Sequence, residues 1–108
     1  MSQSAHQIVL TTCPDLAIAE QIAQTLVAEG LAACVNILPA MRSIYTWKGK
    51  MESTTEHLLL IKSQTRRYPA IQERLRALHP YELPEIIAVP ITHGLPDYLA
   101  WLTLPDKN

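Results

Sequence analysis

Three side chains in this sequence belong to the types that hold soft or borderline metal ions. They are the thiol of Cys13, the imidazole of His79 and the carboxylate of Glu82. A thiolate, an imidazole and a carboxylate together suit copper or zinc. None of the three stands at a tight ligand spacing such as His-x-x-x-His, so a structural role is the alternative. In that role Cys13 is a small buried residue and His79 makes hydrogen bonds at a helix end, where the dipole favours a cation. The sequence predicts copper or another divalent cation as the ligand if these residues do bind a metal.

A second group of residues combines aromatic rings with charged groups. Tyrosine and tryptophan carry a large apolar body with a polar tip, and they favour half-buried positions at interfaces. Such residues either anchor a contact between subunits or line a cleft between subunits that accepts a small ligand. We expect this interface or cleft to contain Cys34, Tyr45, Trp47, Glu56, Lys62, Tyr81, Glu85 and Trp101.

The sequence offers little support for catalysis or for nucleic-acid binding. Ser53 and Ser63 have no recognisable base partner to activate them as nucleophiles. The net charge is −1, and the basic residues are scattered, with Arg66-Arg67 as the one adjacent pair. Phosphate binding draws on a concentrated positive face, and RNA recognition draws on aromatic residues of the central strands, where this chain has isoleucine and leucine. We therefore expect a non-enzymatic protein that does not bind nucleic acid.

Hydropathy and cysteine content bear on the location of the protein. No apolar run approaches the ~20 residues that a membrane-spanning helix needs. Cys13 and Cys34 are too few and too far apart for a disulfide framework, which favours two free thiols. We expect a cytoplasmic protein with no membrane span.

The apolar pattern of the first half predicts a strand, a helix and a long hairpin. A β-rich run at 7–12 ends at Cys13-Pro14, and Asp15 stands where a helix needs an N-cap or a first-turn carboxylate. Apolar residues then recur at helical spacing until Gly30 ends the helix. Strand-like segments follow at 33–38, 41–47 and 51–62, with a turn at 48–50.

The second half predicts a helix, a strand and a short terminal helix. Thr65 is a plausible N-cap, Pro69 fits the first turn, and His79-Pro80 ends the helix. A strand is expected at 85–91, and Asp97 is expected to cap the last helix. The order βαββαβ plus a C-terminal helix is typical of the ferredoxin-like plait of the α+β class. We expect one such domain over residues 1–108, with Cys13 and His79 at the hairpin-turn end of the sheet.

The hairpin is too long for a domain of 108 residues. An arm of ~14 residues reaches roughly 45 Å at the rise of a β-strand. A single domain of this size has a radius of gyration of only ~13 Å. Uncovered strand edges invite pairing with another chain, so the economical arrangement is a closed homo-oligomer. The alternative is a hairpin that folds sharply at Pro39 and is therefore shorter.

Several ordered motifs, spread from about Ile8 to Leu102, resemble one known family. They are Leu31-Ala32-Ala33-Cys34-Val35-Asn36, Ser43-Ile44-Tyr45-Thr46-Trp47-Lys48-Gly49-Lys50, His79-Pro80-Tyr81-Glu82-Leu83-Pro84-Glu85, Pro90-Ile91-Thr92-His93-Gly94 and Asp97-Tyr98-Leu99-Ala100-Trp101-Leu102. Together they resemble the CutA divalent-cation tolerance family. The resemblance implies a cytoplasmic homotrimer built by pairing of the long hairpins, with a role in tolerance of copper and other divalent ions. The architecture is also similar to that of the PII signalling proteins, so a trimeric signalling or scaffold protein with a ligand or partner in its intersubunit cleft is the alternative.

The sequence departs from the family pattern at the copper ligands. Some relatives proposed to bind copper carry a cysteine late in the first strand and a His-His pair before Pro-Tyr. The aligned positions here hold Thr11, Leu78 and His79, so only the second histidine is present. A metal site in this chain would therefore depend on Cys13 and His79, and we expect its affinity to be weak.

Overall fold

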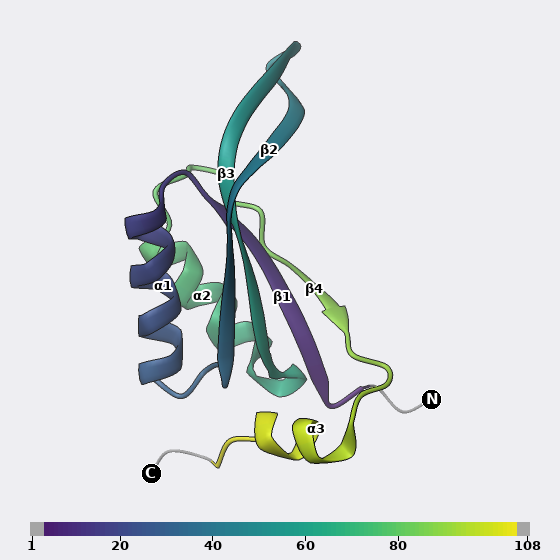
Figure 1. Ribbon diagram of the computed structural model, residues 1–108. Coiled ribbons are helices and arrows are strands. Elements are labelled where there is room, and N and C mark those ends of the chain that lie inside the picture. Colours follow the sequence, from purple (N-terminus) through teal and green to yellow (C-terminus); the bar gives the residue numbers. More distant parts are fainter. Residues whose placement is uncertain (1–3, 106–108) are drawn as a thin grey trace.

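The computed structural model describes residues 4–105 and has the α+β architecture that the sequence predicts. A four-stranded antiparallel sheet has the order β2-β3-β1-β4, and two helices, α1 and α2, cover one of its faces (Figure 1). A third helix, α3, lies at the end of the sheet opposite the hairpin turn. The elements are β1 (His6–Cys13), α1 (Leu16–Ala28), β2 (Cys34–Trp47), β3 (Lys50–Gln64), a 3₁₀ turn (Thr65–Arg67), α2 (Tyr68–Leu78), β4 (Ile87–Pro90) and α3 (Pro96–Leu102).

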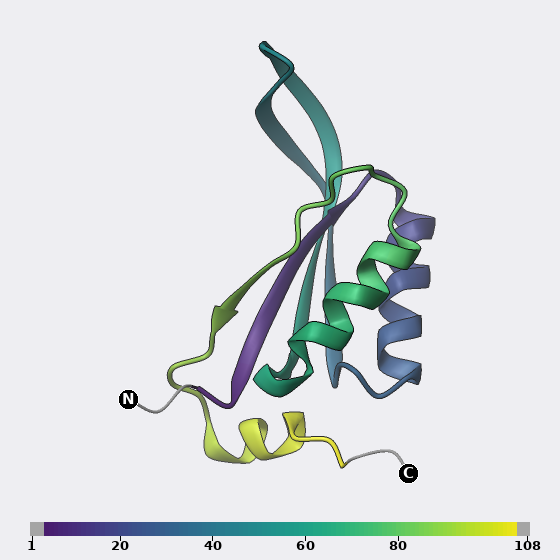
Figure 2. The ribbon, with the colours of Figure 1, turned by 180° about the vertical axis from the view of Figure 1, so that it is seen from behind.

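The hydrophobic core lies between the sheet and the two covering helices (Figure 2). Alternate residues of a strand point to opposite faces, so the odd-numbered residues of β1 and β3 supply the sheet side of the core. Leucine and isoleucine side chains buried in this way each contribute roughly 1.5–3 kcal/mol. The core residues with no more than 1% exposure include Val9, Leu59 and Ile61 of the sheet, Ile22 and Leu26 of α1, and Ile71 and Leu75 of α2.

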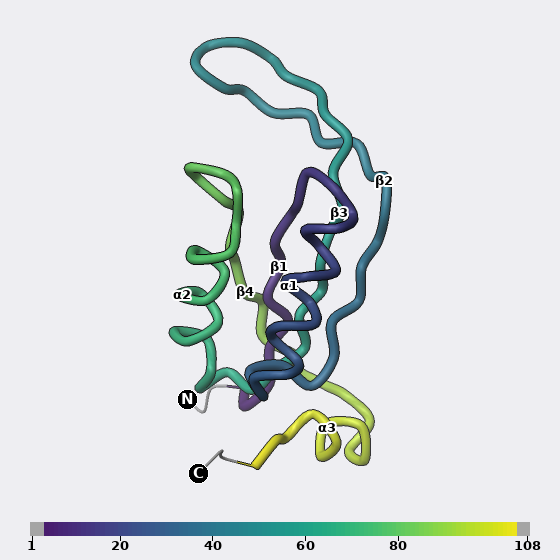
Figure 3. Tube along the Cα trace, turned by 90° about the vertical axis from the view of Figure 1, so that its left-hand side faces the viewer, coloured from purple at the N-terminus to yellow at the C-terminus, as the bar shows by residue number. Residues whose placement is uncertain are grey.

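The opposite face of the sheet is apolar and carries no helix. Leu10 pairs with Leu60 across β1 and β3, and Leu38 pairs with Leu58 across β2 and β3. Leu38 is 45% exposed in the single chain. Figure 3 is seen from the side on which α1 and α2 lie in Figure 1, and both long helices face the viewer there. An exposed apolar face of this kind marks a contact surface.

The β2–β3 hairpin projects well beyond the rest of the sheet (Figure 1). Pairing with β1 ends where Cys13 meets His57, whereas the two hairpin strands stay paired as far as Trp47 and Lys50. The longest dimension of the molecule is 43 Å, close to the length expected for the arm. A register shift interrupts the pairing between Leu38 and Met41, but β2 continues through it, so the predicted alternative of a short hairpin is wrong.

The helix caps follow the prediction in α1 and depart from it in the other two helices. Asp15 caps α1, because its carboxylate accepts a 2.8 Å hydrogen bond from the backbone N–H of Ile18. Thr65 is not an N-cap: it begins the 3₁₀ turn, and its hydroxyl donates instead to the carbonyl of Ser4. Asp97 is not a cap either, since it lies within the first turn of α3.

Strand β4 is shorter than predicted and occupies one edge of the sheet. It covers Ile87–Pro90 rather than 85–91 and pairs only with β1. Pro90 lacks a backbone N–H, which is tolerated at a strand edge. Cys13 and Cys34 are free thiols, as expected. No helix in the described part of the chain is long and apolar enough to cross a membrane.

Candidate functional site

Cys13 and His79 meet at the end of the sheet from which the arm projects. Cys13 is the last residue of β1, and His79 directly follows α2, so the topology brings both to this end as predicted. Their Sγ and Nε2 atoms are 4.0 Å apart. Cys13 is fully buried. Burial, helped by the charges of Asp15 and Glu56, raises the pKa of the Cys13 thiol to about 11. The thiol is therefore protonated and unreactive at neutral pH.

Both ring nitrogens of His79 make hydrogen bonds to the backbone. The N–H of Tyr81 donates to Nδ1 over 3.1 Å, so Nδ1 acts as an acceptor. Nε2 lies 2.6 Å from the carbonyl oxygen of Thr12 and therefore carries the proton. The neutral imidazole thus links the end of β1 to the segment that follows α2. In this arrangement neither nitrogen is available to a metal ion.

The predicted metal ligands do not form a ready-made metal site. Glu82 is exposed. Among residues 4–105 no group of three or more His, Cys, Asp or Glu side chains is placed to hold a metal ion. A closed site needs a deprotonated thiol and a free imidazole nitrogen. The Cys13–His79 pair supplies neither as it stands.

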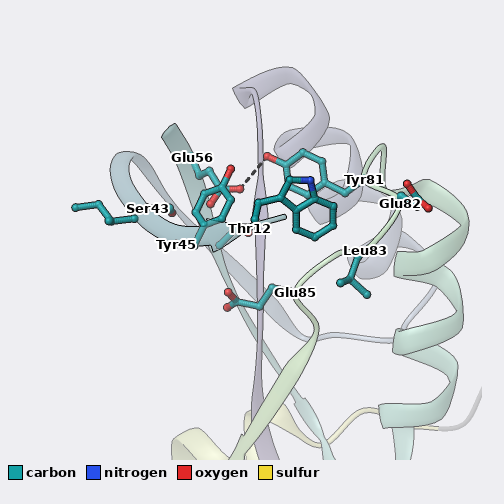
Figure 4. Close-up of a pocket in the computed structure, with 10 residues that line it drawn as sticks. Thr12, Ser43, Tyr45, Glu56, Tyr81, Glu82, Leu83 and Glu85 are labelled. Carbon is teal, nitrogen blue, oxygen red and sulfur yellow. Dashed lines mark hydrogen bonds between the residues drawn. The ribbon is translucent and has the colours of Figure 1, made fainter. Parts of the chain in front are cut away.

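A pocket of about 500 Å³ lies next to this pair, between the arm and the segment that follows α2. Figure 4 shows Tyr45 and Glu56 of the hairpin on one side and Tyr81, Glu82 and Leu83 on the other. Five residues that the sequence assigned to the interface or cleft line it together. The full lining is Thr12, Ser43, Ile44, Tyr45, Trp47, Glu56, Tyr81, Glu82, Leu83 and Glu85.

Glu56 is the most buried of the three glutamates that line this pocket. Glu56 is only 7% exposed, and the Tyr81 hydroxyl donates a 2.8 Å hydrogen bond to its Oε2 atom. Burial and the neighbouring Glu56 raise the pKa of the Tyr81 phenol. The phenol therefore stays protonated and remains a donor to the carboxylate over the whole physiological range.

The other three residues of the predicted interface group lie at the opposite end of the sheet. Cys34 pairs with Lys62 across β2 and β3. The Lys62 Nζ atom lies 5.7 Å from the centre of the Tyr98 ring. The Tyr98 and Trp101 rings stack with centres 5.7 Å apart. Within one chain the predicted group therefore forms two separate clusters, and a single cleft that contains both would need two chains.

Four pocket residues were absent from the sequence prediction. They are Thr12, Ser43, Ile44 and Leu83. Ser43 had a usable signal, because strand alternation places it on the same side as Tyr45 and Trp47. Leu83 lies in an irregular segment with no such periodicity. Its position follows only from the path of the chain after α2.

Comparisons with known proteins agree on one family. The family model for the CutA1 divalent ion tolerance protein matches residues 7–104. The divalent-cation tolerance protein CutA of Thermus thermophilus is 50% identical over 97 residues, which are 90% of this chain and 94% of that protein. A CutA crystal structure from Xylella fastidiosa has a TM-score of 0.89 and 52% identity, and the match covers 92% of this chain and 95% of that one.

Other relatives differ in length and stated location. The chain spans about half the length of the mouse protein CutA that it matches, 84% of this chain against 51% of that protein. A CutA structure from Archaeoglobus fulgidus, described as a periplasmic divalent cation tolerance protein, has a TM-score of 0.87 and 38% identity, and covers 90% of this chain and 94% of that one. The extent and identity of these matches leave one assignment. This chain belongs to the CutA divalent-cation tolerance family.

Proposed function

We propose that this chain forms a homotrimer that acts, without catalysis, in the response to divalent metal ions. The names of its relatives support a role in divalent-cation tolerance. The observation that supports assembly is the amount of apolar surface left uncovered in the single chain. Ile44 and Met51 on the arm are 70% and 81% exposed. A monomer that exposes such surface beside long strand edges is prone to association.

The geometry of the sheet favours a closed ring over a pairwise dimer. The two edge strands are β2 and β4, which differ in length and lie at opposite edges of the sheet. Pairing β2 of one chain with β4 of the next is a heterologous contact, which closes into a ring when the rotation permits. Such a ring places the arm of one chain against the neighbouring sheet.

Sedimentation equilibrium at micromolar protein tests the assembly. The expected mass is three times the 12.1 kDa of the chain. A mass equal to one chain or to two chains would contradict the proposal. A Leu38→Lys substitution on the uncovered face should weaken the trimer. A matched Gln72→Lys substitution on the exposed side of α2 should leave it intact.

Copper binding, as we propose it, is weak and centres on Cys13 and His79, with Glu82 or water completing the coordination. The affinity is low because His79 must give up its hydrogen bond to Thr12 or to Tyr81, and because the buried thiol must lose its proton. Calorimetric copper titration should show a loss of binding in Cys13→Ser/His79→Ala. His93→Ala, which removes an exposed histidine, is the matched control and should bind as the unmodified chain does. Equal affinity of all three proteins would contradict this site.

A second candidate function is a PII-like trimer that senses a small ligand. The pocket beside the arm favours it, because aromatic and charged side chains converge there, while no group of three or more His, Cys, Asp or Glu side chains among residues 4–105 is placed to hold a metal ion. In this function the metal effects are indirect. A protein without measurable copper affinity that still binds a small molecule in the pocket would favour this candidate. The cytoplasmic location expected from the sequence stays a prediction.

A further inference from the structure

We propose that the pocket lined by Tyr45, Trp47, Glu56 and Tyr81 binds a small organic cation of the alkylated-ammonium class. The inference deepens the ligand-sensing candidate and does not depend on copper binding. Its volume of about 500 Å³ lies within the range of small-molecule sites, which is roughly 300–1,000 Å³. The pocket therefore has room for a compact ligand such as a choline-sized ion.

The charge of the pocket selects a cation. Glu56, Glu82 and Glu85 line it, and none of its lining residues is lysine, arginine or histidine. Glu56 is more than nine-tenths buried, and its Oε1 atom makes no hydrogen bond within the part of the chain that the structure describes. Among the described residues this oxygen is not one of the fully buried atoms without a partner, so it is accessible, and a positive ligand in the pocket or water can satisfy it. An anionic ligand would meet repulsion from all three glutamates.

The aromatic lining selects an alkylated cation over a strongly hydrated one. Tyr45, Trp47 and Tyr81 are each about two-fifths exposed in the single chain, and in the proposed trimer this free ring surface would face a cleft between subunits, where the ligand shares it with the neighbouring chain. The faces of tryptophan and tyrosine attract cations, and sets of such rings are the usual recognition surface for quaternary ammonium groups. Trp47 already attracts one cation, because Nζ of Lys48 lies 5.9 Å from its ring centre.

A metal ion fits the pocket less well than an organic cation. No set of three donors in residues 4–105 is placed around one point. The carboxylates are instead distributed over a pocket whose remaining walls are aromatic and aliphatic, namely Ile44 and Leu83 beside the rings. Calcium and magnesium sites use carboxylates that converge on the ion and complete the shell with water, and the carboxylates of this lining do not converge in that way. An organic cation, whose charge is diffuse and weakly hydrated, matches carboxylates spread over the pocket better than a metal ion does.

The test is a titration with choline chloride at constant ionic strength and pH 7.5. The chain has two tryptophans, so a Trp101→Phe variant leaves Trp47 as the only indole reporter. Saturable change in Trp47 fluorescence is expected with choline. The neutral analogue 3,3-dimethyl-1-butanol, which has nearly the same shape, should bind at least about tenfold more weakly, since cation–π and carboxylate attraction are both lost.

Three variants separate the pocket from bulk charge. Glu56→Gln keeps an acceptor for the Tyr81 hydroxyl but removes the charge, and it should lower choline affinity by about tenfold or more. Glu85→Gln, on an exposed position, should lower it by a smaller factor and serves if Glu56→Gln does not fold. Glu73→Gln, exposed on α2 and outside the pocket, should change nothing.

Several outcomes would overturn the proposal. They are no saturable response to choline, equal binding of the neutral analogue, and equal losses in Glu73→Gln and Glu56→Gln. Displacement of choline by calcium chloride at matched ionic strength would also overturn it in favour of a metal site. None of these results alters the sedimentation or copper tests, so this inference and the proposed function fail separately.

Discussion

The Tyr81 hydroxyl donates a 2.8 Å hydrogen bond to Oε2 of Glu56, and this contact joins the segment after α2 to the base of the arm. The backbone N–H of Tyr81 donates a hydrogen bond to Nδ1 of His79, and the centres of the two rings are 4.8 Å apart. The Nε2 atom of His79 makes a hydrogen bond with the carbonyl of Thr12. A continuous chain of hydrogen bonds thus connects the ends of β1 and α2 to the base of the arm. The chain of hydrogen bonds links His79 of the candidate metal pair to Thr12, Tyr81 and Glu56, which line the candidate cation pocket.

Tyr81→Phe tests the energetic weight of that contact. Removing the hydroxyl leaves a nearly buried carboxylate without its donor, which should lower the free energy of unfolding by about 1–3 kcal/mol. Urea denaturation at a fixed protein concentration measures it. Tyr68→Phe is the matched control, because the Tyr68 hydroxyl donates to Gln72 at an exposed site, and it should cost less than about 0.5 kcal/mol. Equal losses in the two variants would show that the Glu56 contact has no special weight.

Trp47→Ala tests whether the arm is an intersubunit anchor. Trp47 is 44% exposed in the single chain, so its remaining surface is available to a neighbour. Truncation of a buried interface anchor typically costs roughly 2–4 kcal/mol per site. The trimer should therefore dissociate or show a marked drop in melting temperature. An unchanged mass in sedimentation together with unchanged melting would mean that the indole is merely exposed, and Glu73→Ala on α2 provides the baseline.

The sequence predicts the architecture well because each element carries its own local signal. Strand alternation, the Asp15 cap and Gly30 define the first half, and Gly30 takes the positive φ of 71° that a helix stop of this kind requires. Thr65 was mispredicted as a cap because its hydroxyl has another partner once the chain folds, and Asp97 was mispredicted because α3 already begins at Pro96. Thr65 bonds to Ser4, which is distant in sequence.

The site could be predicted only in part, because its composition depends on long-range placement. Topology alone correctly brings Cys13 to His79, since β1 and α2 finish at the same end of the sheet. It does not reveal that backbone groups already occupy both nitrogens of that imidazole. The predicted interface group was instead assembled by residue type, which says nothing about which end of the domain a side chain occupies, and it therefore put Lys62 together with Tyr81.

Thr11→Val should stabilise the protein. The Thr11 hydroxyl is fully buried and has no hydrogen-bond partner among the described residues, so its desolvation is uncompensated. Valine has nearly the same shape and removes the polar atom, which should raise the free energy of unfolding by about 1 kcal/mol. Thr25→Val is the control, since the Thr25 hydroxyl donates to the carbonyl of Gln21 at an exposed position. A destabilised Thr11→Val protein would show that this hydroxyl has a partner, such as a buried water.

The Cys13 thiol should make stability fall at alkaline pH. Burial raises its pKa from 9.0 to about 11 in the folded chain. Below pH 9 the thiol is protonated in both states and contributes no pH dependence. As the pH rises from 9 to 11 the unfolded thiol ionises while the folded one retains its proton, so the unfolded state is favoured and the free energy of unfolding falls.

The loss in the free energy of unfolding should reach about 1–2 kcal/mol by pH 10.5, at roughly 1.4 kcal/mol per unit of pKa difference. Urea denaturation at pH 8 and pH 10.5 measures it in the unmodified chain and in Cys13→Ala, where other titrating groups act alike and cancel. Cys34→Ala should retain the full pH dependence, and an identical loss in Cys13→Ala would show that the buried thiol is not its source.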